Sequence, residues 1–401
     1  MSEIRASAGQ SAGDPRPLIA HVVFRFDFGG LENGVANLVN ALPEFRHAIV
    51  ALTEATEFRA RIRRPDVVFV SVGKKPGKDF GAYRRLYKIL RELRPTIVHT
   101  RNFGTLDCAL VAAAAGVRAR IHGEHGWDVH DPDGTNRKHR LIRRVVGHFI
   151  HRFVAVSRDL EQWLVQKVHV SARKVQHICN GVDTERFAGA GSAARASLPA
   201  EQFPPGCIVL GSITRFSEIK DPLNLVRAFI ALRERFALAG PDVRLLMAGD
   251  GPLRAAAVQL LAAAGQSRAA WLPGSRDDVP ELLAAMHLFV LGSLREGISN
   301  TVLEAMASGL AVVASATGGN LELIEPDING TLVPPGDPVA LSEAIARYVS
   351  NPLLREQHGR AARECAVRQY SLTRMVEQYR ELYRSLTPRI LAPTSNTGAI
   401  A

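Results

Sequence analysis

The sequence predicts an α/β protein made of two doubly wound parallel sheets. It has 401 residues, well above the ~150 typical of one domain. Short β-rich apolar runs alternate with longer amphipathic stretches, which is typical of parallel strands covered by helices on both faces. The alternation occurs in two series and lapses between them over residues 180–206, which are rich in Gly, Ala, Ser and Pro. These observations predict two domains joined by a linker.

The first series predicts strands at 19–24, 67–72, 96–99, 118–122 and 153–156, with amphipathic helices between them. The second predicts strands at 208–213, 243–248, 287–291 and 311–315. Helices are expected after Asp221, Gly251, Asp278 and Ser299, and three more over 338–386. Because α/β sheets bind ligands at the carboxyl ends of their strands, we expect both sheets to face an interdomain cleft.

These elements define the predicted domain boundaries. An N-terminal domain spans 18–185, the linker spans 186–206, and a C-terminal domain spans 207–370. A final helix over 371–386 is expected to pack back on the N-terminal domain. Residues 1–17 and 387–401 are small and polar, and we expect them to be disordered.

The composition indicates a cytoplasmic protein in a reducing compartment. No apolar run reaches the ~20 residues that a bilayer requires, and no stretch of signal-peptide type precedes the first strand. The cysteines lack C-x-x-C spacing, so the sequence indicates neither a disulfide framework nor a zinc site. They are Cys108, Cys179, Cys207 and Cys365.

The net charge of +11 lies almost entirely in the first half of the chain. Residues 1–185 hold 29 basic and 19 acidic side chains, whereas residues 186–401 hold 21 and 20. Such asymmetry indicates an anionic partner, either nucleic acid or a membrane carrying acidic lipid. Cationic and apolar residues alternate at roughly helical spacing over 137–152, and Lys74, Lys75 and Lys78 add charge in a separate loop. The 137–152 segment is either a core helix with a solvated basic face or a membrane-docking element.

Two adjacent glycines, Gly29 and Gly30, follow the first predicted strand and open a helix. Glycine lets the backbone approach a ligand closely, and a helix N-terminus offers free N–H groups to an anion. The segment lacks the G-x-G-x-x-G pattern of dinucleotide-binding proteins. A phosphate contact and a purely structural turn both remain open.

A polar cluster over 122–131 follows the fourth predicted strand. It contains His122, Glu124, His125, Asp128 and Asp131. The spacing is not that of a helical zinc site, and the D-x-D form of Asp131 and Asp133 lies in a natural turn sequence. We favour a histidine facing the cleft over a metal site; a loop histidine without function is the alternative.

Arg215 and Lys220 lie five residues apart in the loop after the first strand of the second domain. Both could reach one anion at the N-terminus of the following helix. The alternative is two solvated surface cations.

Glu296 lies in a Gly-containing loop after a strand, and Glu304 lies about one turn into the next helix, with Ser299 as its expected N-cap. Two carboxylates there can accept hydrogen bonds from the vicinal hydroxyls of a ribose or a sugar. Loop N–H groups can meanwhile hold phosphate. The alternative is a glutamate on a helix surface.

In their order and position these segments resemble the retaining family 4 glycosyltransferases of the GT-B fold, from about residue 18 to residue 386. The segments that carry the resemblance are Gly29-Gly30-Leu31-Glu32, Asn180-Gly181-Val182-Asp183, Arg186-Phe187, Arg215 with Lys220, Gly249-Asp250-Gly251-Pro252, and the E-x7-E pair Glu296 and Glu304. Residues 28–36 and 122–128 look most like sugar transferases of exosortase-associated exopolysaccharide systems. At Ser299-Asn300 the chain departs from the commonest sequence of the family motif, so the identity of the donor sugar is left open.

The resemblance implies a donor that is a UDP-sugar or GDP-sugar, held mainly by the C-terminal domain without a metal ion. Arg215 and Lys220 would neutralise the diphosphate. Glu304 would bind the ribose and Glu296 the transferred sugar, while residues 272–279 would flank the base. Backbone of Gly297, Ser299, Asn300 and Thr301 would close around the donor, Gly29 and Gly30 would approach the phosphates, and His125 would contact the sugar.

The implied reaction is transfer to a glycan or polyprenyl-linked acceptor with retention at the anomeric carbon, in exopolysaccharide or cell-envelope polysaccharide synthesis. It needs no carboxylate nucleophile, unlike retaining glycosidases, so His125, Glu296, Arg215 and Lys220 would position groups and stabilise charge. The implied location is the cytoplasm, with peripheral contact to an anionic membrane through the N-terminal domain. Alternatives are a nucleotide-sugar epimerase on the same fold and a non-catalytic polyanion-binding protein. Nucleic-acid binding has little support, because the cations are not interleaved with aromatic residues.

Overall fold

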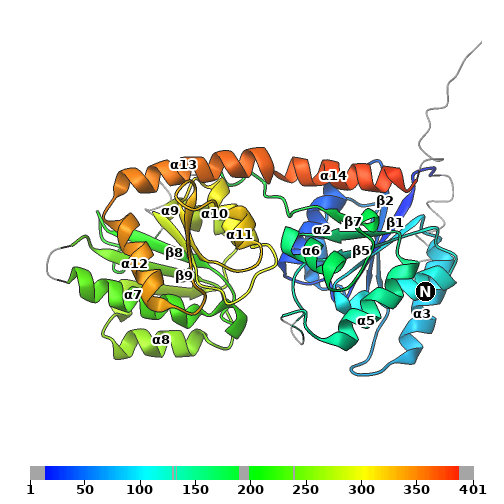
Figure 1. The fold of residues 1–401 in the computed structure, drawn as a ribbon, viewed down its shortest axis with the longest axis horizontal. Coiled ribbons are helices and arrows are strands. Elements are labelled where there is room, and N and C mark those ends of the chain that lie inside the picture. Colours follow the sequence, from blue (N-terminus) through cyan, green and yellow to red (C-terminus); the bar gives the residue numbers. More distant parts are fainter. Residues whose placement is uncertain (1–13, 129–130, 132, 189–197, 238–239, 388–401) are drawn as a thin grey trace, which may run out of the picture. The chain divides into compact units, whose positions relative to one another are not determined.

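The computed structural model describes residues 14–128, 131, 133–188, 198–237 and 240–387 (Figure 1). Within these residues the chain forms two compact units. Unit 1 comprises the described parts of 1–179 and 375–401, and unit 2 comprises those of 180–374. The predicted linker 186–206 lies within unit 2, and its residues 189–197 fall outside the described chain.

Unit 1 contains a seven-stranded parallel sheet in the order β3-β2-β1-β4-β5-β6-β7. The strands are β1 (Leu18–Val23), β2 (Arg46–Ala51), β3 (Val68–Ser71), β4 (Ile97–Arg101), β5 (Ala119–Glu124), β6 (Arg152–Ala155) and β7 (Val175–His177). The helices are α2 (Gly30–Ala41), α3 (Phe80–Leu93), α4 (Cys108–Ala114), α5 (Arg137–Val146), α6 (Arg158–Gln166) and α14 (Leu372–Ser385), the last belonging to unit 1 from Met375 onward.

Burial on both faces explains why β1 is an almost continuous apolar run. All six of its residues are buried. Ala20 and Val22 pack in one core with α3 and α4, whereas Val23 packs in another with α2. The period of two along a strand thus sends alternate residues to helices on opposite faces of the sheet.

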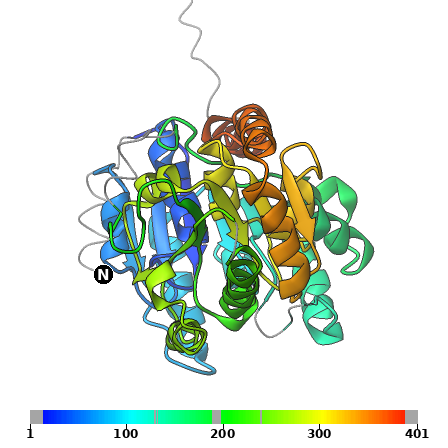
Figure 2. The ribbon, with the colours of Figure 1, turned by 90° about the vertical axis from the view of Figure 1, so that its left-hand side faces the viewer.

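Unit 2 contains a six-stranded parallel sheet in the order β10-β9-β8-β11-β12-β13. The strands are β8 (Ile208–Ile213), β9 (Val243–Ala248), β10 (Ala270–Gly274), β11 (Leu288–Leu291), β12 (Val312–Ser315) and β13 (Gly330–Val333). Helices α7 (Pro222–Phe236), α8 (Arg254–Ala263) and α12 (Pro338–Val349) pack on one face; α9 (Val279–Ala285), α10 (Asn300–Ala307) and α13 (Pro352–Gln369) pack on the other (Figures 1 and 2). The short helix α11 (Asn320–Leu323) contacts α10.

Four strands were absent from the sequence-based prediction: β2, β7, β10 and β13. Strand β2 begins with the polar residues Arg46 and His47, and the edge strand β10 contains Pro273 and Gly274. These residues weaken the apolar pattern that predicts a strand. Strands β7 and β13 have only three and four residues. The two sheets are therefore larger than the apolar runs indicated.

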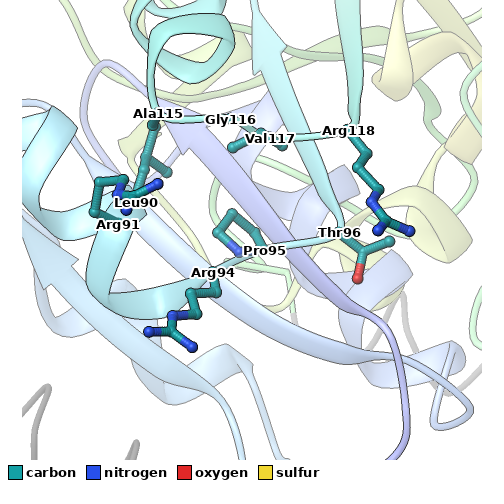
Figure 3. Close-up of a pocket in the computed structure, with 9 residues that line it drawn as sticks. All are labelled: Leu90, Arg91, Arg94, Pro95, Thr96, Ala115, Gly116, Val117 and Arg118. Atoms are coloured by element: carbon teal, nitrogen blue, oxygen red, sulfur yellow. The ribbon is translucent and has the colours of Figure 1, made fainter.

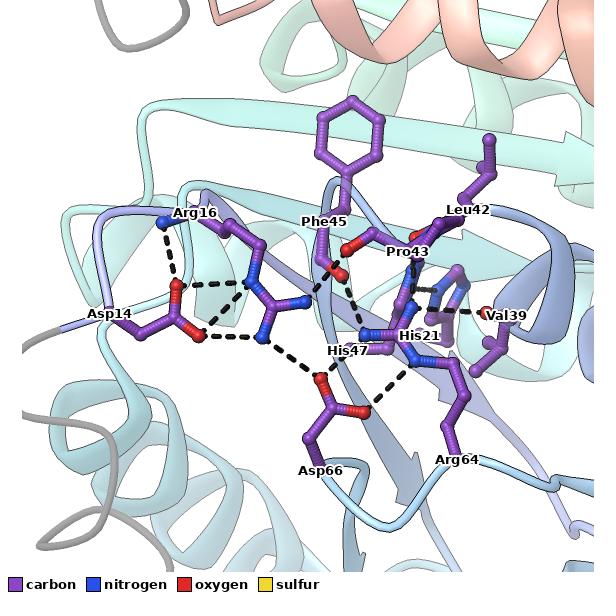
Figure 4. A network of polar contacts seen from close by, with 10 residues as sticks. All are labelled: Asp14, Arg16, His21, Val39, Leu42, Pro43, Phe45, His47, Arg64 and Asp66. Carbon is purple, nitrogen blue, oxygen red and sulfur yellow. Dashed lines mark hydrogen bonds and ion pairs between the residues drawn. The ribbon is translucent and has the colours of Figure 1, made fainter.

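Order begins before the predicted first strand. Arg16 lies between Asp14 and Asp66 with N–O distances of 2.6 and 3.0 Å, and it also donates to the carbonyl of Pro43 at 2.7 Å (Figure 4). Its hydrogen bond holds the pKa of Asp14 at about 2. Residues 14–17 are thus not part of a disordered start, because these ion pairs attach them to the sheet. Residues 1–13 fall outside the described chain.

Helix α14, which matches the final helix expected over 371–386, contacts the sheet of unit 1. The hydroxyl of Tyr383 lies 3.0 Å from Nδ1 of His99, and Arg380 pairs with Glu44 at 2.5 Å. Thr387 is buried and donates to the carbonyl of Tyr383, so this residue is not part of a disordered tail. Residues 388–401 fall outside the described chain.

Candidate active site

The strand order of unit 2 reverses between β8 and β11. Strands β8, β9 and β10 follow one another in one direction, and β11, β12 and β13 follow in the other. In open α/β sheets, ligands bind at the carboxyl ends of the strands that flank such a reversal. The loop after β8 carries Arg215 and Lys220, and the loop after β11 carries Glu296, so the structure brings both predicted motifs to this point.

Lys220 and Glu296 form an ion pair across the reversal. Nζ of Lys220 lies 2.6 Å from Oε1 of Glu296, and the two side chains are only 19% and 4% exposed. The amide of Leu294 donates to the carbonyl of Ile219 at 2.9 Å and ties the two loops together. The pair therefore offers one fixed cation and one fixed carboxylate side by side, largely shielded from water.

Two glycines after β12, Gly318 and Gly319, fix the position of the Glu296 loop. Gly319 N–H donates to the carbonyl of Gly297 at 2.8 Å. A Cβ on Gly318 would overlap the carbonyl oxygen of Glu296, and one on Gly319 would overlap that of Gly297. Glycine is required here because the backbones touch. The sequence analysis did not single out this pair, although Gly-Gly directly after an apolar run could have indicated a close approach.

The start of α10 gathers the remaining predicted donor residues of this unit. Oγ of Ser299 accepts from the amide of Val302 at 3.3 Å, which confirms Ser299 as the N-cap. The side chain of Asn300 lies 2.9 Å from that of Asn180, and the hydroxyls of Ser299 and Thr301 are 3.2 Å apart. Glu304 lies in the second turn and is half-buried. This arrangement leaves hydroxyl, amide and carboxylate groups at one helix end.

Arg215 lies in the same loop as Lys220 but is exposed, and it has no ion pair among the residues that the structure describes. The loop itself is held by the turn after β9. Amide N–H of Phe216 donates to the carbonyl of Asp250 at 2.9 Å, and Gly249 and Gly251 approach backbone carbonyls of Thr214 and Phe216 closely. Residues 272–279 cover the end of β10, where the carbonyl of Gly274 accepts from Gly249 at 2.8 Å.

In unit 1 the strand order reverses between β1 and β4, and Gly29 and Gly30 follow β1. Both glycines are exposed, and Gly29 is the N-cap of α2 in an extended conformation. The carboxylate of Glu32 folds over Gly29, where a Cβ would overlap its oxygen. The carboxylate of Glu32 therefore lies at the positive end of α2.

His125 follows β5, and its backbone N–H donates to Oδ1 of Asn102 at 2.7 Å. Burial, reinforced by the charge of Arg101, lowers its pKa to about 3, so its imidazole is neutral near pH 7. Its Nε2 is buried without a hydrogen-bond partner among the described residues. Nε2 of His99 also has no hydrogen-bond partner among the described residues. The Nε2 atoms of His99 and His125 both lie beside Gly123, close to where a Cβ on this glycine would be. The neutral ring can therefore still bond to a ligand hydroxyl.

Behind His125 lies a buried cluster that the sequence analysis missed. Arg101 is 3% exposed, and its guanidinium lies 3.0 Å from Nδ1 of His21 and 3.3 Å from Nδ1 of His99. His21 in turn lies 3.0 Å from His47, whose Nε2 lies 3.0 Å from the carbonyl of Leu42 (Figure 4). Burial lowers the pKa of each histidine, so the cluster holds one cation among neutral rings.

The polar residues around 122–133 have structural partners. Glu124 pairs with Arg143 at 2.7 Å, and Oδ1 of Asp131 accepts from the amide of Asn136 at 3.0 Å. Asp128 and Asp131 form a local bridge. Among the described residues no three His, Cys, Asp or Glu side chains are grouped to hold a metal ion. Residues 129, 130 and 132 of this predicted cluster fall outside the described chain.

Two family models match the chain, one for each half. "Glycosyltransferase Family 4" matches residues 28–186, and "Glycosyl transferases group 1" matches residues 204–351. The chain is 26% identical over 313 residues to the UDP-Gal:alpha-D-GlcNAc-diphosphoundecaprenol alpha-1,3-galactosyltransferase of Escherichia coli, covering 76% of this chain and 79% of that protein. It is 27% identical over 313 residues to the Bacillus subtilis (strain 168) protein EpsF, named as a glycosyltransferase, covering 74% and 78% of the two chains.

Solved structures share the fold. The crystal structure of Anabaena Alr3699/HepE in complex with UDP and glucose superposes with a TM-score of 0.79 at 19% identity, covering 92% of this chain and 99% of that one. Sucrose-phosphate synthase from Thermosynechococcus elongatus has a TM-score of 0.75 at 20% identity, covering 93% and 100%. The two family-model matches include the loops that carry Gly29, His125, Lys220 and Glu296. The chain therefore belongs to the family 4 glycosyltransferases, retaining hexosyltransferases of the GT-B fold that need no metal ion.

Proposed function

We propose that the protein transfers a sugar from a UDP-sugar or GDP-sugar to a glycan or lipid-linked glycan in exopolysaccharide or cell-envelope polysaccharide synthesis. The observation that carries the proposal is the shielded Lys220–Glu296 pair at the strand-order reversal of unit 2. A cation and a carboxylate held together suit a donor that joins a diphosphate to a hydroxyl-rich sugar.

In unit 2 we assign Lys220 and Arg215 to the diphosphate and Glu296 to the transferred sugar. Glu304 binds the ribose, and the backbone of Gly297, Ser299, Asn300 and Thr301 surrounds the donor. Residues 272–279 flank the base. From unit 1 we assign Gly29 and Gly30 to the phosphates. We assign His125, whose Nε2 has no partner among the described residues, to a sugar hydroxyl.

The chemical step breaks the bond between the anomeric carbon and the diphosphate and forms the bond to the acceptor oxygen on the same face. The acceptor proton passes to the departing phosphate oxygen. Charge grows on the diphosphate as it leaves, so Lys220 and Arg215 act chiefly by stabilising that charge. Glu296 accepts a hydrogen bond from Lys220, which suits it to positioning rather than to nucleophilic attack.

The acceptor is proposed from the relatives. The Escherichia coli protein acts on a sugar linked through diphosphate to undecaprenol, and EpsF and EpsD of Bacillus subtilis are named as glycosyltransferases. A lipid-linked acceptor lies in a membrane. No helix among the described residues combines the length and apolarity needed to cross one. We therefore propose that the protein works at the inner face of the cytoplasmic membrane and contacts anionic lipid through unit 1.

The test is calorimetric binding of UDP and GDP, preceded by a thermal-shift screen of nucleotide-sugars. The unaltered protein should bind one of the two nucleotides, and Lys220→Ala and Glu304→Ala should weaken that binding strongly. If both variants bound the nucleotide as tightly as the unaltered protein does, the proposed donor site would be refuted. Incubation with donor alone separates an epimerase, which converts the sugar, from a transferase, which leaves it intact or hydrolyses it slowly.

A further inference from the structure

The amino-terminal edge of the unit 1 sheet, opposite the edge that carries Gly29 and His125, is strongly basic. Cations gather there from the end of α3 and from the starts of β5, β6 and β7. They are Arg91, Arg94, Arg118, Arg120, Arg152 and Lys174. None of the six forms an ion pair among the described residues, whereas Arg16 and Arg64 near β1 and β3 pair with aspartates. Part of the surplus charge of the N-terminal half therefore lies at this edge without an acidic partner among the described residues.

Three of these arginines are among the residues that line an open pocket of about 380 Å³ (Figure 3). Arg91 and Arg94 come from the end of α3, and Arg118 comes from the residue before β5; all three are exposed. Pro95 and Gly116 contribute to the floor, and no carboxylate lines the pocket. Three guanidinium groups without an acidic partner favour binding of a phosphate group.

The neighbouring cations are held in place by carbonyl groups. Nε of Arg120 donates to the carbonyl of Phe149 at 2.5 Å, and Nζ of Lys174 donates to that of Ile150 at 2.8 Å. Burial, followed by the charges of Arg120 and Arg152, lowers the pKa of Lys174. These bonds join the basic edge to the short 3-10 helix η3 (Gly147–Phe149), which directly follows α5.

Helix α5 and η3 present apolar side chains on an exposed basic face. Leu141, Val145 and Phe149 are 60%, 53% and 46% exposed. Arg137, Lys138 and Arg144 are also exposed on this helix. Arg137 lies four residues before Leu141, Lys138 lies three before it and Arg144 lies three after it, so the cations share a helix face with Leu141. Exposed leucine and phenylalanine among arginines are typical of a helix that lies in a membrane interface.

We propose that the amino-terminal edge of the unit 1 sheet, together with α5 and η3, docks on an anionic phospholipid bilayer. The Arg91–Arg94–Arg118 pocket binds a lipid phosphate, and Leu141, Val145 and Phe149 enter the interface between headgroups and acyl chains. Nucleic acid matches the cations but leaves the three apolar side chains in water. The proposal rests on the proposed function only in that a lipid-linked acceptor requires an enzyme at a membrane.

The experiment is flotation of the full chain, without donor or acceptor, on vesicles of phosphatidylcholine alone or of equal parts phosphatidylcholine and phosphatidylglycerol. The protein should float only with the anionic vesicles, and added salt should weaken binding. The variant R91Q/R94Q/R118Q should lower the partition coefficient on the order of 100-fold, since each cation contributes about 1 kcal/mol near such a surface. The variant L141S/V145S/F149S should also lower it.

Matched variants in unit 2 serve as controls. Arg227, Arg360 and Arg368 are exposed arginines, and Val339, Leu353 and Val367 are 65%, 77% and 47% exposed. R227Q/R360Q/R368Q and V339S/L353S/V367S should float like the unaltered protein. Equal flotation of the unit 1 and unit 2 variants, or equal flotation on both lipids, would overturn the proposal. In a Trp271→Phe background, the fluorescence of Trp127 and Trp163 reports whether unit 1 of each variant is folded. Donor binding, measured separately, tests the proposed function on its own.

Discussion

Nζ of Lys220 donates to Oε1 of Glu296 at 2.6 Å, and this contact joins residues 76 positions apart in the sequence. It spans the reversal of strand order between β8 and β11. The glutamate is 4% exposed, so its charge depends on the lysine for compensation. The ion pair therefore holds the lysine in one position and shields it from water. Under the proposed function, such a group would stabilise a diphosphate with little reorganisation.

Replacing Lys220 should lower activity, and it should also cost stability because it leaves the buried carboxylate of Glu296 unpaired. We expect Lys220→Ala to lower kcat/KM about 10²–10³-fold, the usual effect of removing one group that stabilises developing charge. Lys220→Arg should retain more activity because it keeps the charge. Arg227→Ala on α7, an exposed cation of the same unit, is the control and should leave kcat/KM unchanged. Similar losses in both alanine variants would argue against a specific role for Lys220.

The two glycines after β12 should be intolerant of any side chain. Gly319→Ala would force its Cβ against the carbonyl of Gly297 and displace the loop that carries Glu296. We expect weaker nucleotide binding, measured by calorimetry, with unit 2 still folded. The control is Gly34→Ala in α2, where nothing lies within 4 Å, and it should stabilise the protein by about 0.5–1 kcal/mol. Unchanged nucleotide affinity in Gly319→Ala would show that the loop position is unimportant.

The Glu124–Arg143 pair should contribute far more to stability than an exposed pair does. Both side chains are at most 3% exposed, and the guanidinium lies 4.5 Å from the ring centroid of Phe103 and 5.0 Å from that of Trp163. Glu124→Ala should cost about 3–5 kcal/mol because it leaves a buried cation unpaired. Arg347→Ala, which breaks an exposed 2.7 Å pair with Asp327, should cost less than about 1 kcal/mol.

Urea unfolding can measure how much each of the two ion pairs contributes to the free energy of unfolding. A Trp271→Phe background leaves Trp127 and Trp163 as the reporters of unit 1, and far-UV circular dichroism follows the whole chain. Comparable losses of stability in the two variants would contradict the difference expected from burial.

Acid should destabilise unit 1 through its buried histidines. Burial lowers the pKa of His47 to about 4, whereas its ordinary value is 6.5. Between pH 6.5 and pH 4, His47 is protonated in the unfolded chain but neutral in the folded chain. The free energy of unfolding therefore falls as the pH falls through this window, and it levels off below about pH 4. His47 alone should remove about 3 kcal/mol across this window, since one pKa unit corresponds to about 1.4 kcal/mol.

The variant His47→Gln tests this expectation, because glutamine can still bond to Leu42 and His21 but does not titrate. Its unfolding free energy, measured from pH 7 to pH 4, should fall less steeply than that of the unaltered protein. His148→Gln, at an exposed position, is the matched control for the loss of one imidazole. An unchanged slope in His47→Gln would exclude His47 as a cause of acid sensitivity.

Much of the fold could be predicted from local patterns. Strands β8 and β9 lie where the apolar runs 208–213 and 243–248 predicted them, because strands buried on both faces have almost no polar positions. The N-cap at Ser299 was predicted from residue type and position alone. Local patterns failed at β2, which opens with Arg46 and His47, because the burial of His47 depends on a partner outside the strand, the carbonyl of Leu42.

The sequence by itself determined the α/β class, the loops that carry Gly29, Lys220 and Glu296, and the family. Only the tertiary structure decided which of these side chains meet. Lys220 pairs with Glu296 because β8 lies beside β11, and Arg101 contacts His21 because β1 lies beside β4. Periodicity along one strand specifies which face a residue takes, whereas its neighbour across the sheet depends on strand order, which is set by packing of the whole domain.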